Sequence, residues 1–363
     1  MEKDYFKSRE EITIVKLRQV RKDLPYLCNE YFVGIETSTS PLTRLGYALD
    51  LRIFFDYLCN KQDGRFMGKD VHDLSFDDLE KIEALDIEMF LEYLSDYEFD
   101  GIKYTNTKKT KARKLSTLKS FFKYFYCKDK IYRDPAAKVR SPKIPEKPIV
   151  RFEQDEVVKF LDNVESGAEL TKRQQAFHAK TEKRDYAICT LFLGTGIRIS
   201  ELVGLNLKDI DFDKNQFKIT RKGGNQDVLY FNDEVKDALL EYLDDRAQNE
   251  ELDNEPALFC SRQNKRMCVR SVEKLIKKYA EVTTPLKHIT PHKLRTTYGT
   301  NLYKETRDIF VVAEVLGHKD VNTTKKHYAA ISEDIKKEAA DKVYLRSQDN
   351  LDKNLSNDSE SDD

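Results

Sequence analysis

The chain has 363 residues, of which 35% are charged and 11% aromatic, which suffices for two domains that each bury a core. No stretch approaches the 18 consecutive apolar residues of a membrane span, and the N-terminus lacks the basic-then-apolar order of a signal peptide. The six cysteines are scattered without a CxxC pair, which favours reduced thiols over a disulfide frame or a zinc site. We therefore expect a cytoplasmic protein without a membrane partner.

The formal net charge of −1 hides an uneven distribution along the chain. The last 17 residues hold six acids and one lysine, a charge of −5, which leaves +4 for the other 346 residues. A nearly neutral total can therefore conceal a basic working face, and the charge has to be read locally.

The first 139 residues predict helices. Residues 1–30 carry an apolar repeat typical of a leading helix, which Pro25 ends or bends. Further helices are expected at 41–58, at 75–82 and at 86–93, the last capped by Asp86. We expect residues 31–139 to form one helical domain.

One further helix of this domain, expected at 105–127, carries seven cations and no acid. Its apolar residues recur at steps of three and four, so one face can pack while the other presents charge. A charged run is usually only a solvated face, but one sign over about six turns of helix repels itself unless an anion compensates it. We favour DNA phosphates as that anion. The cations are Lys108, Lys109, Lys111, Arg113, Lys114, Lys119 and Lys123.

Residues 140–150 hold three of the nine prolines of the chain, together with Lys143. Proline at this density predicts an extended, semi-rigid connector of about 3 Å per residue, and so a linker between two domains. We expect Lys143 to contact DNA together with most of the helical cations. The predicted DNA-binding residues are Lys108, Lys109, Lys111, Arg113, Lys114, Lys119 and Lys143.

The second domain, residues 151–345, predicts helices around one β-hairpin, so the fold class is mainly α with a small β-sheet (α+β). The strands are expected at 217–220 and 228–231, and a polar insertion at 165–183 is expected to form a surface helix-loop. The Asp/Ser/Asn-rich tail at 346–363 is expected to be disordered. Helices are expected at 154–164, 184–193, 199–205, 233–246, 270–282, 291–303, 308–317 and 332–345, with another around Tyr328.

Several polar residues of this domain suit a phosphate, although each has an ordinary structural alternative. Arg198 and Glu201 lie three residues apart on one helix face, where a carboxylate can orient a guanidinium fork toward phosphate oxygens, or where the two form a common salt bridge. His292 and Arg295 repeat this spacing. Lys222, at the end of a strand, is a candidate proton donor or DNA contact, or simply a basic turn residue.

The combination of these residues is more specific than its parts. This set resembles the tyrosine recombinase (phage integrase) superfamily over nearly the whole chain, and looks similar to the Xer-like site-specific recombinases of Gram-positive bacteria or the integrases of their mobile elements. The resemblance implies a helical, SAM-like core-binding domain followed by a mixed α/β catalytic domain. In chain order the residues that carry it are Gly194-Thr195-Gly196-Ile197-Arg198-Ile199-Ser200-Glu201, Lys222-Gly223, His292-Lys293-Leu294-Arg295, Leu316-Gly317-His318 and Tyr328.

The resemblance also implies a role for each residue. Tyr328 attacks the scissile phosphate, although it follows His318 by ten residues where many relatives use nine. His327 stands at the nine position and has no phenol, so Tyr328 remains the predicted nucleophile. For the others, Arg198 and Arg295 clamp the phosphate, Glu201 supports them, Lys222 protonates the leaving 5′ oxygen, His292 assists proton transfer at the nucleophile, and His318 hydrogen-bonds the phosphate.

The activity that the resemblance implies is site-specific recombination. DNA is cut and rejoined through a covalent 3′-phosphotyrosyl intermediate, for integration and excision or for the resolution of chromosome dimers. The expected partners are double-stranded DNA, three further copies of the chain in a homotetramer on paired sites, and accessory recombination factors. No cofactor or metal is expected, since the HxxxH spacing of His288 and His292 lacks a third ligand. The alternatives are a type IB topoisomerase, a non-catalytic DNA-binding regulator and, less favoured, a metal-dependent nuclease.

Overall fold

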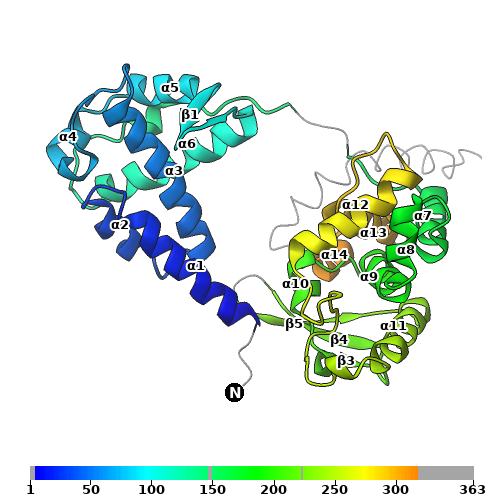
Figure 1. Ribbon diagram of the computed structural model, residues 1–363. Coiled ribbons are helices and arrows are strands. Elements are labelled where there is room, and N and C mark those ends of the chain that lie inside the picture. The colour runs from blue at the N-terminus through cyan, green and yellow to red at the C-terminus, as the bar shows by residue number, and fades with distance from the viewer. Residues whose placement is uncertain (1–4, 146–148, 222–223, 318–363) are drawn as a thin grey trace, which may run out of the picture. The chain divides into compact units, whose positions relative to one another are not determined.

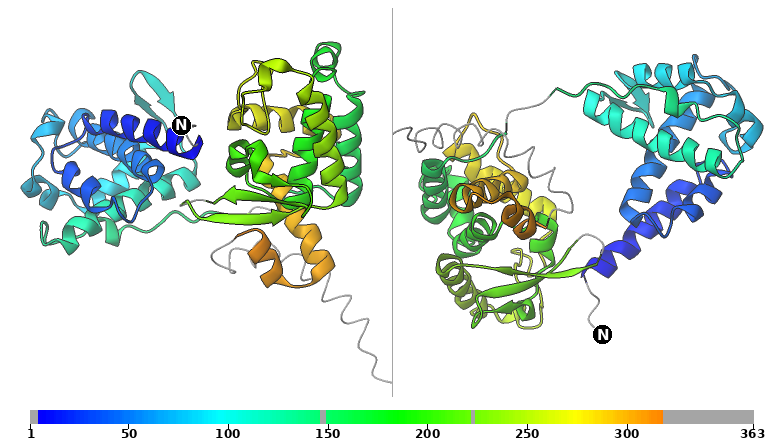
Figure 2. Two further views of the ribbon diagram at one scale, coloured as in Figure 1. Left: turned by 90° about the horizontal axis from the view of Figure 1, so that it is seen from below. Right: turned by 180° about the vertical axis from the view of Figure 1, so that it is seen from behind.

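The structure, a computed structural model, describes residues 5–145, 149–221 and 224–317. Two compact units divide the chain, Met1–Lys147 and Pro148–Asp363. The described residues form helices with two small antiparallel sheets, which confirms the predicted fold class (Figures 1 and 2). Within these residues, no helix is both long enough and apolar enough to cross a membrane.

The first unit is built on two long helices, α3 and α6, which pack against each other. A short hairpin of β1 and β2, which the sequence did not predict, precedes α6. The elements are α1 (Tyr5–Arg21), α2 (Cys28–Gly34), α3 (Pro41–Asn60), η1 (Val71–Asp73), α4 (Phe76–Lys81), α5 (Ala84–Tyr93), β1 (Tyr97–Phe99), β2 (Ile102–Tyr104), α6 (Lys108–Cys127) and η2 (Ala136–Lys138).

Aromatic side chains fill the core of this unit. The apolar stripe predicted on α6 is buried along its whole length, from Leu115 to Phe125. Its ring at Phe121 lies 5.8 Å from that of Phe55 on α3, edge to face, the arrangement that aromatic rings prefer. One side of α6 is therefore committed to packing, and only the other side is open to a partner.

Local sequence signals set most of the helix starts, with one correction. Ser75 and Asp78 form a reciprocal capping box at the start of α4. Asp86, expected to cap the next helix, instead lies inside its first turn, because α5 already begins at Ala84. The Asp86 carboxylate accepts a hydrogen bond of 2.7 Å from the backbone N–H of Glu83, so it closes the helix start from within.

The second unit surrounds the apolar helix α9, which packs against α7, α11 and α13. Its three-stranded sheet has the order β3-β4-β5, and the buried side chains of Phe217 and Leu229 face each other across the hairpin. The elements are α7 (Gln154–Ser166), α8 (Lys172–His178), α9 (Glu182–Thr195), α10 (Ile199–Gly204), η3 (Leu207–Asp209), β3 (Ile210–Asp211), β4 (Gln216–Thr220), β5 (Gln226–Tyr230), α11 (Asp233–Ala247), η4 (Glu250–Leu252), α12 (Val269–Thr283), α13 (Pro291–Thr306) and α14 (Ile309–Val315).

The polar insertion at 165–183 contains the expected short helix, α8, but it is anchored more firmly than a surface loop. His178 at the end of α8 is buried, and its Nδ1 lies 2.9 Å from the hydroxyl of Tyr279. That hydroxyl donates in turn to the buried carboxylate of Asp185, at 3.0 Å. Burial and the charge of Asp185 raise the pKa of Tyr279, so its proton stays in this network.

Candidate active site

A left-handed turn between α9 and α10 places Arg198. Gly196 has a φ of 62°, and a Cβ at this position would lie 2.4 Å from the ring of Tyr298. Only glycine fits a turn with this backbone and this close neighbour. Arg198 follows at the N-cap of α10, so its side chain leaves the turn close to the helix start.

The buried carboxylate of Glu201 holds Arg198 from behind. One oxygen accepts from the Arg198 backbone N–H at 3.0 Å, and the other accepts from its Nη1 at 2.9 Å. The Glu201 side chain is 2% exposed, whereas that of Arg198 is 33% exposed. The carboxylate therefore orients a guanidinium that still reaches solvent, as the i,i+3 spacing predicts.

Arg295 comes to the same turn from α13. Pro291 occupies the first position of this helix, as predicted, although the Thr290 side chain forms no capping hydrogen bond. Arg295 is buried and donates from Nη1 to the carbonyl of Gly196 and from Nη2 to that of Leu316. The structure thus brings Arg295 to the pair of Arg198 and Glu201, although it follows them by almost 100 positions in the sequence.

A third arginine, Arg221, completes this cluster and was missed by the sequence analysis. Its Nη1 lies 3.4 Å from both carboxylate oxygens of Glu201, and its Nη2 donates at 3.3 Å to the carbonyl of Val315. Asp227, on the neighbouring strand, accepts from its Nε at 3.0 Å. Asp227 is only six residues away across the predicted hairpin, but nothing in the sequence signals the contacts to Glu201 and Val315, which lie 20 and 94 residues away.

Three consecutive carbonyls at the end of α14 are the common target of the three arginines. The carbonyl of Val315 accepts from Arg221, that of Leu316 from Arg295, and that of Gly317 from Arg198 at 3.0 Å. These oxygens carry the negative end of the helix dipole, which favours cations. The carbonyls therefore gather cationic groups directly before His318.

The remaining predicted catalytic residues are placed as follows. His292 lies on α13 three positions before Arg295, and it is exposed. Lys222, His318 and Tyr328 lie outside the described residues, as do the helices expected around Tyr328 and at 332–345 and the tail. No group of three or more His, Cys, Asp or Glu side chains within residues 5–145, 149–221 and 224–317 could hold a metal ion.

Tyr298 lies beside the turn that leads to Arg198, but its chemistry differs from that of a nucleophile. It is partly buried against Gly196. Burial raises the pKa of Tyr298, and the charge of Arg295 opposes this shift only in part. Because a higher pKa leaves less phenolate at neutral pH, Tyr298 is suited to packing.

The basic helix α6 splits its cations between two environments. Lys108, Lys109, Lys123 and, beyond the helix, Lys143 are exposed, and Lys119 is partly exposed. Lys111 donates at 2.6 Å to Ser95.

Lys114 and Arg113 instead bind a carboxylate on α3, although the Arg113 side chain is still 55% exposed. Lys114 is buried and lies 3.0 Å from Asp50, to which Arg113 also donates two hydrogen bonds, of 2.5 and 2.7 Å. Thr117 donates to the same carboxylate at 2.8 Å. Lys114 therefore does not lie on the exposed face with the other cations, contrary to our expectation, since Asp50 supplies part of the compensating charge from within the protein.

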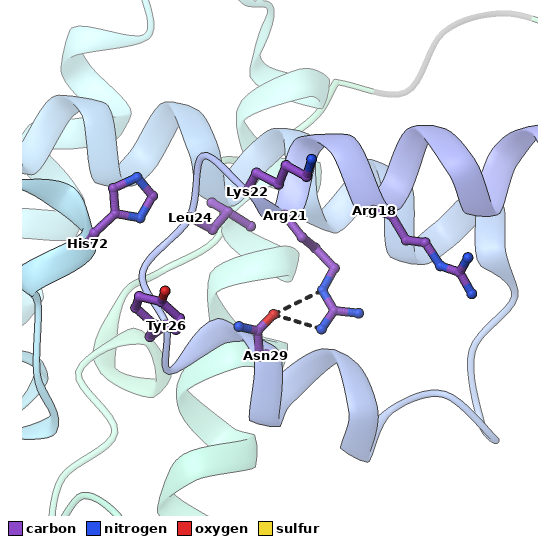
Figure 3. A pocket seen from close by; sticks show the side chains of 7 residues that line it. All are labelled: Arg18, Arg21, Lys22, Leu24, Tyr26, Asn29 and His72. Atoms are coloured by element: carbon purple, nitrogen blue, oxygen red, sulfur yellow. Dashed lines mark hydrogen bonds between the residues drawn. The ribbon is translucent and has the colours of Figure 1, made fainter.

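The first unit also has a cavity of about 700 Å³ at the end of α1. Figure 3 shows Arg21 pointing at Asn29, whose Oδ1 accepts from its Nη2 at 2.7 Å. Burial and the nearby Arg44 lower the pKa of Arg21. The lining includes three cations and no carboxylate, which favours an anion as occupant. It consists of Arg18, Arg21, Lys22, Leu24, Tyr26, Asn29 and His72.

Comparison with known proteins gives a consistent result. The model of the phage integrase family matches residues 151–334. A tyrosine recombinase XerC of Caldanaerobacter subterraneus subsp. tengcongensis is 33% identical over 305 residues, which cover 81% of this chain and 79% of the relative. A tyrosine recombinase XerS of Streptococcus agalactiae is 30% identical over 364 residues, which cover 92% of this chain and all of the relative.

Solved structures of similar fold include DNA complexes. An XerH site-specific recombinase bound to its palindromic difH substrate matches with a TM-score of 0.63 and 19% identity, over 84% of this chain and 80% of that chain. The Tn1549 transposon integrase in complex with a circular intermediate DNA matches with a TM-score of 0.59 and 18% identity, over 83% and 94%. At these identities the likeness shows the fold.

Proposed function

The chain belongs to the phage integrase family of tyrosine recombinases, and we propose that it recombines double-stranded DNA at the arginine cluster around Arg198. One observation supports this choice of site. A solvent-reaching guanidinium is fixed by the buried carboxylate of Glu201, next to a second guanidinium on Arg295. Arg295 is buried and its two Nη groups donate to the neutral carbonyls of Gly196 and Leu316, which phosphate oxygens can replace. Two guanidinium forks can then bind the two non-bridging oxygens of one phosphodiester.

The proposed reaction proceeds by covalent catalysis. The phenolic oxygen of Tyr328 forms a bond to phosphorus while the bond from phosphorus to the 5′ oxygen breaks, and Lys222 donates a proton to that oxygen. His292 assists removal of the phenol proton, and His318 hydrogen-bonds the phosphate. A 5′ hydroxyl of another strand then attacks the phosphotyrosine, so the DNA is rejoined without an external energy source. The family pattern supports these roles.

The arginines supply the electrostatic part of this mechanism. The phosphate gains negative charge as the phenol attacks, and cationic donors already in place stabilise that charge at little reorganisation cost. Each such donor is worth roughly 3 kcal/mol in comparable oxyanion sites. Tyrosine has a pKa of about 10 in water, so the same cationic field also favours its deprotonation.

We also propose that the exposed side of α6 binds the duplex. Lys108 and Lys109 at its start are exposed, and the family relatives solved with DNA support double-stranded DNA as the partner. The cavity in Figure 3, with its three cations, is a further candidate for a phosphate contact. The buried Lys114 is excluded from this set.

On the DNA we propose a homotetramer that joins two sites, assisted by accessory factors, in the cytoplasm. The reaction serves either the integration and excision of a mobile element or the resolution of chromosome dimers. Complete exchange between two sites requires four strand cleavages, which four identical protomers can provide.

The nucleophile can be tested with a nicked duplex that carries an inverted-repeat site recovered from genomic DNA by its binding to the protein. The wild-type protein is expected to form a covalent protein–DNA complex that survives denaturing electrophoresis, and Tyr328→Phe to form none. If Tyr328→Phe still forms the complex, the nucleophile is wrong. If the wild-type protein forms none on any bound site, the chain is a DNA-binding protein that does not cleave.

Two further experiments separate the related activities. Lys222→Ala should slow cleavage sharply, and a 5′-phosphorothiolate substrate, whose sulfur leaves without a proton, should restore the rate. Rapid relaxation of a supercoiled plasmid that lacks the bound site would favour a type IB topoisomerase over a recombinase.

A further inference from the structure

Arg221 lies at the point where three parts of the second unit meet. It directly follows β4, and its backbone N–H donates at 2.7 Å to the carbonyl of Asn225, which closes the hairpin. Its side chain contacts Glu201 on α10, Asp227 on β5 and the carbonyl of Val315 at the end of α14. A single guanidinium thus connects the hairpin, the helix behind Arg198 and the turn before His318.

Every nitrogen of this guanidinium is already engaged with the protein. Nε donates to Asp227 at 3.0 Å, Nη1 lies 3.4 Å from each oxygen of Glu201, and Nη2 lies 3.3 Å from the carbonyl of Val315 and 2.9 Å from Asp227. The side chain is only 11% exposed. With all three nitrogens engaged and little exposure, Arg221 differs from Arg198, whose side chain is 33% exposed and whose Nη2 donates to a neutral carbonyl.

Close packing against Gly317 also holds the Arg221 guanidinium beside the turn 315–317. Gly317 has a φ of 59°, and a Cβ at this position would lie 2.7 Å from Cζ of Arg221. The guanidinium therefore lies directly against the backbone of the turn. Any displacement of Arg221 opens space under Gly317, whose carbonyl accepts from Arg198.

Glu201 is shared between the two arginines. Its side chain is 2% exposed, and a buried carboxylate is stable as an anion only when hydrogen bonds and cations surround it. Arg198 approaches it from the same turn and Arg221 from the hairpin. Without Arg221, the carboxylate can rotate toward Arg198, and this change alters the direction in which Arg198 points.

We propose that Arg221 is a positioning residue of the phosphate site: it holds Glu201 and the turn 315–317 in place and thereby orients Arg198 toward the scissile phosphate. This inference rests on the proposed function. Lysine cannot take over the role, because one ammonium group lacks the planar fork that reaches three acceptors in different directions.

The test compares Arg221→Ala and Arg221→Lys with a matched control, Arg266→Ala. Arg266 also clamps backbone carbonyls near α10, those of Val203 and Leu205 at 2.9 Å each, and its Nη2 donates to the Asn206 side chain at 2.5 Å. Each variant is measured for single-turnover cleavage of the nicked site, for affinity to the same duplex and for unfolding in urea.

We expect both Arg221 variants to cleave about 100-fold more slowly, the loss that a small misplacement of a reacting group produces, while their affinity for DNA changes less than twofold. Arg266→Ala should keep the wild-type cleavage rate in its folded fraction. In a double-mutant cycle, Arg221→Ala should add little to the loss caused by Arg198→Ala, because both act through one guanidinium.

Three results would overturn the proposal. The first is wild-type cleavage by folded Arg221→Ala, and the second is losses that multiply in the double variant. The third is a fall in DNA affinity that accounts for the whole loss, which would make Arg221 a phosphate ligand. If Arg221→Ala does not fold, Arg221→Lys decides the same questions. Failure of the proposed function is distinct, since the wild-type protein would then form no covalent complex.

Discussion

The two units of this protein each bury a carboxylate among cations, Asp50 in the first and Glu201 in the second, and the two clusters have different uses. Both side chains are at most 3% exposed and both accept charge-assisted hydrogen bonds. The cations of Asp50 come from one turn of a neighbouring helix. Those of Glu201 come from its own helix start and from a hairpin.

The difference lies in what else the cations bind. Lys114 is 5% exposed and its charge is matched by a carboxylate, so no external anion can reach it. Arg198 is 33% exposed, and its second hydrogen bond goes to the neutral carbonyl of Gly317. A phosphate oxygen binds a guanidinium more strongly than a carbonyl does, so it can displace that bond. Arg113 of the Asp50 cluster is itself 55% exposed, but its two hydrogen bonds go to the carboxylate. The exchangeable partner, and not the number of ion pairs or exposure alone, therefore separates a reactive cluster from a structural one.

The largest expected effect is on cleavage by Arg198→Ala. Removing one preorganised donor from an oxyanion site typically lowers the rate about 100-fold to 1,000-fold, so single-turnover cleavage should fall by this factor. The free energy of unfolding should fall by less than in Asp50→Ala, because Arg221 still lies beside the buried carboxylate of Glu201. If Arg198→Ala loses several kcal/mol of stability but cleaves at the wild-type rate, Arg198 contributes to stability and not to the reaction.

Asp50→Ala should show the reverse pattern. It leaves Lys114 buried without its counter-charge, which typically costs about 3–5 kcal/mol, measured by urea denaturation. The folded fraction should cleave at the wild-type rate. The control is the double variant Asp50→Leu, Lys114→Met, which should recover most of the stability, because apolar groups can replace a buried ion pair. A loss below about 1 kcal/mol in Asp50→Ala would show that the cluster contributes little.

The exposed and buried cations of α6 should differ in the salt dependence of DNA binding. Lys108→Ala and Lys109→Ala are each expected to lower the slope of log affinity against log salt by about one, the value for one phosphate contact. Lys114→Met should leave the slope unchanged. Equal slopes for all three variants would show that the buried Lys114 contacts phosphate as the exposed lysines do, which contradicts our interpretation.

The smallest effect concerns pH. Burial lowers the pKa of Lys114, and the attraction of Asp50 offsets this only in part. The unfolded chain therefore binds this proton more tightly than the folded protein, so the contribution of Lys114 to stability is largest above the unfolded pKa of about 10.4 and is lost as pH falls through the folded value. The wild-type protein should gain stability relative to Lys114→Met as pH rises toward 10. If urea titrations show the wild-type protein losing stability relative to Lys114→Met as pH rises, the attraction of Asp50 outweighs the effect of burial on the pKa of Lys114.

The sequence by itself determined the features that depend on near neighbours. The apolar stripe of α6, the capping box of Ser75 and the i,i+3 pair of Arg198 and Glu201 were all readable, because helix geometry relates residues three or four positions apart. The motifs around them also pointed to the family that the comparisons show.

Only the tertiary structure decided which cations are free to act. Lys114 already lies at helical spacing with the apolar residues of α6, four positions before Leu118, but only packing against α3 supplies its counter-ion, Asp50, 64 residues earlier. The contacts of Arg221 to residues 201 and 315 had no signal in the sequence, since they form only when the hairpin and α14 pack against α10. Charge in a sequence is a local property, whereas burial and the identity of the counter-ion depend on residues that are distant along the chain.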